Sequence, residues 1–187
     1  MQTDAPVRCS WVNINNPVYV RYHDEEWSVP CHDDHALYEL LILECFQAGL
    51  SWECVLNKRE NFRRAYDGFD AAKVAAYGEE KIAALLADPG IIRNRRKVAA
   101  SVRNSAAFVA IRAEFGSFER YIWGFTDGKT IREPFTLRTF SPLSDAVSKD
   151  LKQRGMTFVG TTIVYSYLQA IGVLSAHAED CFCCGRR

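Results

Sequence analysis

The sequence predicts an all-α protein, and two observations carry that prediction. Residues that favour helix starts (Asp, Asn and Ser) stand before runs of helically spaced apolar residues, and Gly or Pro-Gly steps follow several of these runs. Residues 126–140 are irregular, and a small strand pair is conceivable there. With 187 residues, 48% of them hydrophobic, the chain can form one compact domain or two lobes on a shared core. We expect a single domain over residues 1–187, with residues 1–7 and 185–187 as loose ends.

The first two helices are expected on either side of a glycine corner. Asp33 or Asp34 can cap a helix that ends at about Ala48. Ser51 can cap the next helix, which runs toward Tyr66. Further helices are expected from Asp70 to Gly78, over 79–87, from about Asn94 to Phe115, over 117–125, from Ser141 or Ser144 to Arg154, and from Thr161 or Thr162 to about Leu174.

The composition excludes several classes of protein. No run reaches the roughly 18 apolar residues that a membrane-spanning helix needs, and the chain starts without the apolar segment of a secretory signal. Seven cysteines are an odd number for a chain without an export signal, so metal ligands or free thiols are expected rather than disulfides. Acidic and basic residues balance at 23 each, so only a local patch could attract nucleic acid. We expect a cytoplasmic protein.

One carboxylate stands inside the most apolar of these helices. Glu44 is the only charged residue from Leu40 to Trp52. If buried, it must be paired, hydrogen-bonded or held with a raised pKa, because bare burial of a charge is too costly. An acid followed by the large ring of Trp52 at a helix end indicates a pocket. The sequence leaves one alternative open, a core glutamate satisfied by an arginine or a backbone group.

Segment 85–98 predicts a helix, a tight glycine turn and a second helix start. Gly90 permits an unusual turn, and the backbone amides of the second helix start suit a phosphate. From Pro89 to Ala113 there is no acidic residue, and the basic residues are Arg93, Arg95, Arg96, Lys97, Arg103 and Arg112. This segregation favours sequence-independent binding of a nucleic-acid backbone. A solvated basic helix face is the alternative.

The two ends of the chain carry candidate metal ligands. Cys9 and His23 lie near the start, and His177 and Cys181 are spaced so that one helical turn places them on one face. Two thiolates and two imidazoles are a common closed zinc set. A structural zinc ion would then tie the N-terminal arm to the C-terminal tail. The competing ligands are Cys183, Cys184, His32 and His35, and unligated thiols are a further alternative.

Several stretches match the pattern of one known family. Two blocks are specific, Tyr-His-Asp-x-Glu-Trp at 22–27 and Gln-Ala-Gly-Leu-Ser-Trp at 47–52. The other matches are Arg8 to Trp11, Tyr19 to Arg21, Lys58 to Arg63, Gly90 to Arg93, Phe158 to Thr162, and His177 with Cys181. In these stretches, from about residue 8 to 184, the chain resembles the type I 3-methyladenine DNA glycosylases of the helix-hairpin-helix superfamily.

The resemblance implies a two-lobed helical bundle with a zinc site that ties the termini, and it implies roles for single residues. The zinc ligands would be Cys9, His23, His177 and Cys181. Glu44 falls on the carboxylate that hydrogen-bonds the excised base, and the rings that would stack on or surround this base are Tyr22, Trp52, Trp11, Tyr19 and Trp27. The residues expected to contact DNA are Gln47, Gly49, Leu50, Gly90, Arg93 and Lys97. At the start of the last helix, Thr161, Thr162 and Ser166 could touch the flipped nucleotide, with capping and packing as the alternative.

The resemblance also implies an activity. The chain would flip 3-methyladenine out of alkylated duplex DNA and hydrolyse its N-glycosidic bond. It is expected to act as a monomer and not to bind membranes. Methylation makes the base a good leaving group, so a powerful nucleophile is not needed. Many relatives use an aspartate soon after the hairpin, but this chain has none between Asp88 and Asp127. We therefore expect Glu44 to act by recognition and electrostatic stabilisation, with water as the nucleophile.

Some residues depart from the family pattern. Ser10 and Ser28 stand where glycine is common, Cys45-Phe46 replaces a frequent Gly-Gln pair, and Arg96 stands where some members have glycine. The Cys45-Phe46 pair beside Glu44 favours an alternative function, a non-catalytic protein that binds damaged DNA. A zinc-stapled helical interaction module is a third reading of the chain.

Overall fold

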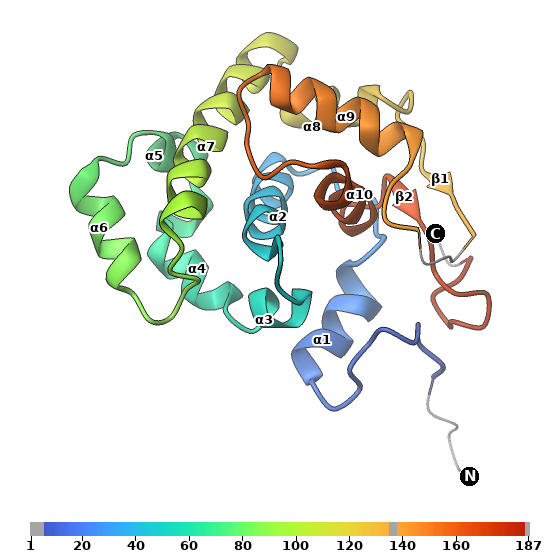
Figure 1. Cartoon of the computed structure of the whole chain (residues 1–187). Helices are drawn as coiled ribbons and strands as arrows, with labels where there is room; N and C mark the ends of the chain where they lie inside the picture. Colours follow the sequence, from blue (N-terminus) through green and yellow to red (C-terminus); the bar gives the residue numbers. More distant parts are fainter. Residues whose placement is uncertain (1–5, 135–137, 186–187) are drawn as a thin grey trace.

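The computed structural model describes residues 6–134 and 138–185, and it is mostly helical (Figure 1). The helices are α1 (Pro17–Arg21), the π-helical turn η1 (Tyr22–Glu26), α2 (Asp34–Gln47), α3 (Trp52–Leu56), α4 (Arg59–Ala65), the 3₁₀ turn η2 (Asp67–Phe69), α5 (Ala71–Ala75), α6 (Glu79–Ala87), α7 (Arg95–Phe115), α8 (Phe118–Gly124), α9 (Pro142–Gln153) and α10 (Thr161–Ala170). The strands are β1 (Ile131–Arg132) and β2 (Leu174–Ser175). The predicted helical class is confirmed.

The capping residues expected from the sequence start their helices. The Asp33 carboxylate accepts from the Ala36 amide at 2.8 Å, and the Asn94 side chain accepts from the Lys97 amide at 3.2 Å. Ser51 caps α3. Each of these bonds satisfies an amide that the first helical turn leaves without a partner.

Several elements differ from the sequence expectation, and α1 and η1 were not expected at all. The helix expected from Ser51 is divided into α3 and α4 near Lys58, whose ammonium group donates to two carbonyls of the 88–90 turn. α10 ends at Ala170 rather than near Leu174, because Leu174 pairs in β2 with Ile131 of β1. The strand pair is parallel, and only β1 comes from the irregular stretch 126–140. Residues 135–137 of that stretch lie outside the described residues.

α2 forms the centre of the molecule, with α4 to α7 on one side and α9 and α10 on the other (Figure 1). Its side chains from Leu37 to Phe46 are all buried. This central position explains why the two acids of α2, Glu39 and Glu44, are almost inaccessible to solvent. Among the helices of residues 6–134 and 138–185, none is long and apolar enough to span a bilayer.

The two ends of the chain lie together. The Phe182 amide donates to the Val7 carbonyl at 2.9 Å. Of the ends that the sequence predicts to be loose, residues 1–5 and 186–187 lie outside the described residues. Val7 is held by this hydrogen bond, although its side chain is exposed.

Candidate functional site

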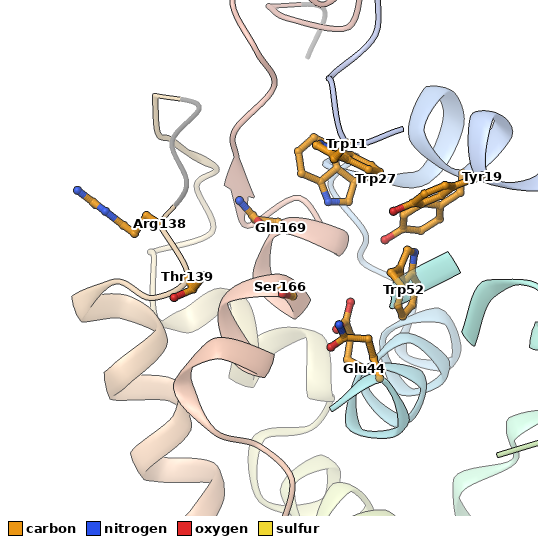
Figure 2. A pocket seen from close by; sticks show the side chains of 11 residues that line it. Trp11, Tyr19, Trp27, Glu44, Trp52, Arg138, Thr139, Ser166 and Gln169 are labelled. Atoms are coloured by element: carbon orange, nitrogen blue, oxygen red, sulfur yellow. The ribbon is translucent and has the colours of Figure 1, made fainter. Parts of the chain in front are cut away.

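A cavity of about 330 Å³ opens where α10, the aromatic N-terminal segment and the C-terminal end of α2 meet. Its walls come from segments far apart in the sequence (Figure 2). The lining residues are Trp11, Tyr19, Tyr22, Trp27, Glu44, Gln47, Trp52, Arg138, Thr139, Ser166 and Gln169. All six site residues that the sequence assigns to the base are therefore in one cavity.

Glu44 rises from α2 toward the rings of Tyr19 and Trp52 (Figure 2). It is 3% exposed, and its Oε2 has no hydrogen-bond partner within the described part of the chain. Burial raises the pKa of its carboxyl group to about 8. The ion-paired core glutamate that the sequence left open is instead Glu39, which binds Arg59 and Arg63. A buried acceptor without a protein partner at a cavity wall indicates a site for a ligand.

Tyr22 and Trp52 form the wall next to this carboxyl group. Their ring centroids are 5.3 Å apart with an interplanar angle of 47°. The two rings already touch at this distance, so a planar ligand that stacks between them must displace one. Trp52 Nε1 is buried and has no partner among the described residues. Burial raises the pKa of Tyr22 well above its usual value, and nearby Glu44 adds to the shift, so the phenol stays neutral.

Trp11, Tyr19 and Trp27 form a second aromatic wall. The centroid of Trp11 lies 5.4 Å from that of Tyr19 and 4.9 Å from that of Trp27. η1 explains how Tyr22 and Trp27 both reach the cavity, because the Trp27 amide closes this π-helical turn on the Tyr22 carbonyl at 2.8 Å. Such turns are often found at functional sites.

One wall of the cavity, supplied by α10 and the loop before α9, was predicted only in part. The sequence left Ser166 between nucleotide contact and packing, and it did not assign Gln169, Arg138 or Thr139. Ser166 and Gln169 line it from α10, and Arg138 and Thr139 from the loop before α9 (Figure 2). A signal was available, since Thr162, Ser166 and Gln169 follow the i, i+4, i+7 spacing of one helix face. The hydroxyl group of Thr161, by contrast, bonds Ser144 Oγ at 2.8 Å and ties α10 to α9.

The corner after α2 exposes the residues that the sequence assigns to DNA contact there. Gly49 has φ +78°, a conformation that a side chain would strain. Leu50 is 39% exposed although it is a large apolar residue. The Gln47 amide group holds the corner by donating to the Leu50 carbonyl at 2.9 Å.

Gly90 and Arg93 lie in the turn that joins α6 to α7. A Cβ atom at Gly90 would lie 2.9 Å from Asp88 Oδ1 and 3.2 Å from Asn61, so close packing rather than backbone freedom requires glycine. Arg93 is exposed, as are Arg95 and Arg96. An exposed basic turn of this kind can face a phosphate backbone.

Lys97 does not face solvent, and its expected role in DNA contact is wrong on this geometry. The residue is 7% exposed, and its Nζ donates to the carbonyls of Phe46 at 2.7 Å and Ala48 at 2.6 Å. The end of α2 leaves carbonyl groups without helical partners, and a cation is favoured there. Lys97 therefore caps the C-terminal end of α2 and holds in place the backbone that leads into the corner at Gly49.

The residues that depart from the family pattern beside Glu44 face the core. The ring of Phe46 packs 4.8 Å from that of Phe62, and Cys45 Sγ accepts from Asn104 at 3.4 Å. Neither is among the described residues that line the cavity. Ser28 adopts φ +66°, which accounts for glycine being common at its position.

Four candidate metal ligands from the two ends of the chain converge. The ligand atoms of Cys9, His23, His177 and Cys181 all lie within 4.8 Å of one another. Cys181 Sγ is 3.5 Å from His23 Nε2 and 3.6 Å from His177 Nδ1. These separations suit a tetrahedral ion with bonds of about 2.0–2.3 Å to nitrogen and sulfur.

The surroundings of this Cys/His group also fit a metal. His23 Nδ1 contacts Asp24 Oδ1 at 2.8 Å, which leaves Nε2 for a metal, and Asp24 is held by Arg8. Cys183, a competing ligand, forms a second possible group with His23 and Asp24. The two histidines that the sequence offered as competing ligands contact other groups. His32 contacts Glu119, and His35 contacts the Gly68 carbonyl.

Comparison with known proteins agrees with this geometry. The sequence pattern of the family described as methyladenine glycosylase matches residues 11–184. The chain is 44% identical over 183 residues to DNA-3-methyladenine glycosylase 1 of Escherichia coli (strain K12), in a match that covers 94% of this chain and 96% of that protein.

Solved structures show the same similarity. A crystal structure of 3-methyladenine DNA glycosylase I, 44% identical, superposes with a TM-score of 0.90 over 95% of this chain and 99% of that chain. A tyrosine-to-phenylalanine variant of 3-methyladenine DNA glycosylase I in complex with 3-methyladenine is 36% identical, with a TM-score of 0.86 over 89% of this chain and 91% of that chain. The chain therefore belongs to the methyladenine glycosylase family.

Proposed function

We propose that this chain is a DNA repair N-glycosylase that releases 3-methyladenine from alkylated duplex DNA and leaves an abasic site. The observation that carries the proposal is Glu44, a buried carboxyl group with an unpartnered oxygen in an aromatic cavity. Such a site favours a planar cation over its neutral parent. The names of the relatives and the bound 3-methyladenine of a similar structure support this choice of substrate.

In this function the aromatic walls bind the flipped base. Removing a nucleotide from the stack costs a few kcal/mol. Stacking on Tyr22 and Trp52 contributes roughly 1–3 kcal/mol per base contact, and a desolvated cation over a ring gains about 2 kcal/mol. These gains offset the cost of extraction, with Trp11, Tyr19 and Trp27 excluding water from the other side of the cavity.

Glu44 selects and stabilises the methylated base. The positive charge of the base favours the ionised form of the carboxyl group, which then accepts hydrogen bonds from the adenine edge. When the glycosidic bond breaks, its electron pair moves to the purine and neutralises that charge. A water molecule bonds to the sugar carbon and releases a proton to the surrounding solvent. Glu44 is the one carboxylate among the described residues that line the cavity. We therefore assign no other carboxylate to the attack of water on the sugar.

The DNA-facing residues follow from their exposure. Leu50, on the corner with Gly49 and Gln47, enters the gap that the flipped nucleotide leaves. Gly90 and Arg93 contact backbone phosphates from the turn between α6 and α7, in a helix-hairpin-helix arrangement. Lys97 has no part in this contact because its ammonium group is used inside the protein.

The Cys/His group of Cys9, His23, His177 and Cys181 holds a zinc ion in this proposal. The donor set and the separations on which the assignment depends fit zinc. Bound there, the ion supplies a cross-link between the two terminal segments and no chemistry on DNA. We further propose that the protein is one domain and acts as a monomer in the cytoplasm.

A base-release assay tests the proposed function. Duplex DNA that carries 3-methyladenine is incubated with the wild-type protein, and the free base is measured by chromatography. We expect release of 3-methyladenine together with new abasic sites. Binding of the damaged duplex without release would instead support the non-catalytic alternative, which lost its main support when Cys45 and Phe46 were found to face the core.

A further inference from the structure

An ion network that includes the buried Glu39 joins the segment that carries Tyr22 to the helix that carries Glu44. Arg59 of α4 bonds Glu39 of α2 through its Nε, and its Nη1 lies 2.6 Å from Glu26 Oε2 of η1. The side chain of Arg59 is 11% exposed and that of Glu39 is 4% exposed. Few surface ion pairs fix geometry. A mostly inaccessible guanidinium that binds two carboxylates does fix it, because its planar fork of donors is rigid.

Glu26 belongs to the same helical turn as the stacking ring. η1 runs from Tyr22 to Glu26, and the Trp27 amide closes it on the Tyr22 carbonyl. The ion pair at the Glu26 carboxylate therefore restrains a turn that begins at Tyr22 and is followed by Trp27, and the rings of both residues line the cavity. The preceding helix is tied separately, because Asn16 Nδ2 donates to Glu53 at 2.8 Å and to Asn57 at 2.9 Å.

We propose that Arg59 is a positioning residue for base recognition, which fixes the ring of Tyr22 relative to the Glu44 carboxyl group by holding Glu26 and Glu39 together. The inference rests on the proposed function of the cavity. Arg59 lines a different depression, on the α4 side of η1, and is not among the described residues of the base cavity. It acts through Tyr22 rather than on the substrate.

Arg63 provides a matched control within the same network. It also binds Glu39, at 2.9 Å, but its second partner is Glu60 of its own helix rather than Glu26. Both arginines therefore hold the buried Glu39, and only Arg59 continues to η1. A purely structural role predicts that any loss of base affinity follows the loss of stability in each variant, whereas positioning predicts an effect on the base from Arg59 alone.

The experiment compares Arg59→Lys, Glu26→Gln and Arg63→Lys with the wild type. Each variant is examined for quenching of tryptophan fluorescence by free 3-methyladenine, for kcat and KM on duplex DNA that carries the lesion, and for chemical unfolding. Lysine keeps the charge but loses the rigid fork. Glu26 has a side chain that is 39% exposed, so Glu26→Gln leaves the fold intact and tests the link even if Arg59→Lys is unstable.

We expect Arg59→Lys and Glu26→Gln each to raise the Kd for the base and the KM by about tenfold, a part of the full stacking contribution. The kcat should stay within about threefold of the wild-type value. A variant that combines Arg59→Lys with Glu26→Gln should bind the base no more weakly than either single variant, because both changes break the same link. Arg63→Lys should leave base affinity unchanged. Equal base affinity in all three variants, or equal losses in Arg59→Lys and Arg63→Lys, would overturn the inference. A wild-type protein that neither binds nor releases the base would instead refute the proposed function.

Discussion

Burying the Glu44 carboxyl group disfavours its charged form, and the proposed function uses this buried charge to hold a cationic base. Its position on the central helix α2 removes it from water, and burial raises the pKa of its carboxyl group to about 8. In the free protein at neutral pH the group is therefore mostly protonated. In the proposed function the ionised form holds the cationic base, so binding this base expels the proton.

This coupling predicts a pH dependence. Below the pKa of about 8, the ionised fraction of Glu44 in the free enzyme rises about tenfold per pH unit. The kcat/KM for base release should therefore rise steeply from pH 6 and level off above about pH 8. The measurement is a pH series of base release from DNA carrying 3-methyladenine. A flat profile between pH 6 and pH 8 would show that the ionised group is not needed.

At the scale of elements, the end of α2 is the feature that connects fold and site. Lys97 from α7 caps the carbonyls of Phe46 and Ala48. This capping holds the corner that exposes Gly49 and Leu50. We therefore propose two uses for the basic run from Arg93 to Lys97, with the exposed arginines available to DNA and the lysine committed to the fold.

Two substitutions separate these uses. Arg93→Gln should weaken DNA binding and reduce the slope of log affinity against log salt by about 1, because one phosphate contact is lost. Lys97→Met should leave that slope unchanged and lower the free energy of unfolding by about 1–3 kcal/mol, because buried carbonyls lose their donor. Fluorescence anisotropy over a salt series and chemical unfolding provide the two readouts. A reduced salt slope in Lys97→Met would restore this residue to the DNA surface.

At the scale of the whole molecule, the two chain ends meet at the Cys/His group. This closure places Trp11 and Trp27 against the histidines of that group, with the centroid of Trp27 4.6 Å from that of His177. If this group holds the proposed zinc ion, loss of that cross-link would loosen one wall of the cavity as well as the termini.

Metal removal should accordingly destabilise the protein. We expect about one zinc per chain after purification, and a fall in Tm of about 10 °C or more on treatment with a strong chelator. Cys181→Ser should lower the metal content, whereas Cys31→Ser, away from the group, should not. Elemental analysis and calorimetry on the same samples check this. An unchanged Tm after chelation would contradict a structural metal.

The sequence predicted the parts of the fold that local chemistry determines. The caps at Asp33, Ser51 and Asn94 marked helix starts because each side chain bonds an amide of its own first turn. The pairing of β1 with β2 and the π-helical turn η1 were not predicted, since both depend on partners distant in the sequence or on an irregular bond pattern. The pairing of Lys97 with the end of α2 was missed for the same reason, because 51 residues separate it from Phe46.

The candidate site was predicted to a similar extent. The motifs brought Glu44, Tyr22 and Trp52 together correctly, because the resemblance to a family supplies tertiary information that periodicity lacks. Gln169 was not assigned and Ser166 was left open, since the helical spacing marks a polar face on α10 but does not say whether that face meets a cavity or solvent. The positions of their backbones depend on the packing of α10 against α2 and α9.

The central claim is that the Glu44 carboxyl group distinguishes the methylated base, and Glu44→Gln tests it most directly. The glutamine has the same shape but cannot carry the charge that a cationic base requires. We predict that the variant folds, still binds duplex DNA, and releases 3-methyladenine at least about tenfold more slowly than the wild type at pH 8. Release within about twofold of the wild-type rate by a folded Glu44→Gln protein would contradict the account.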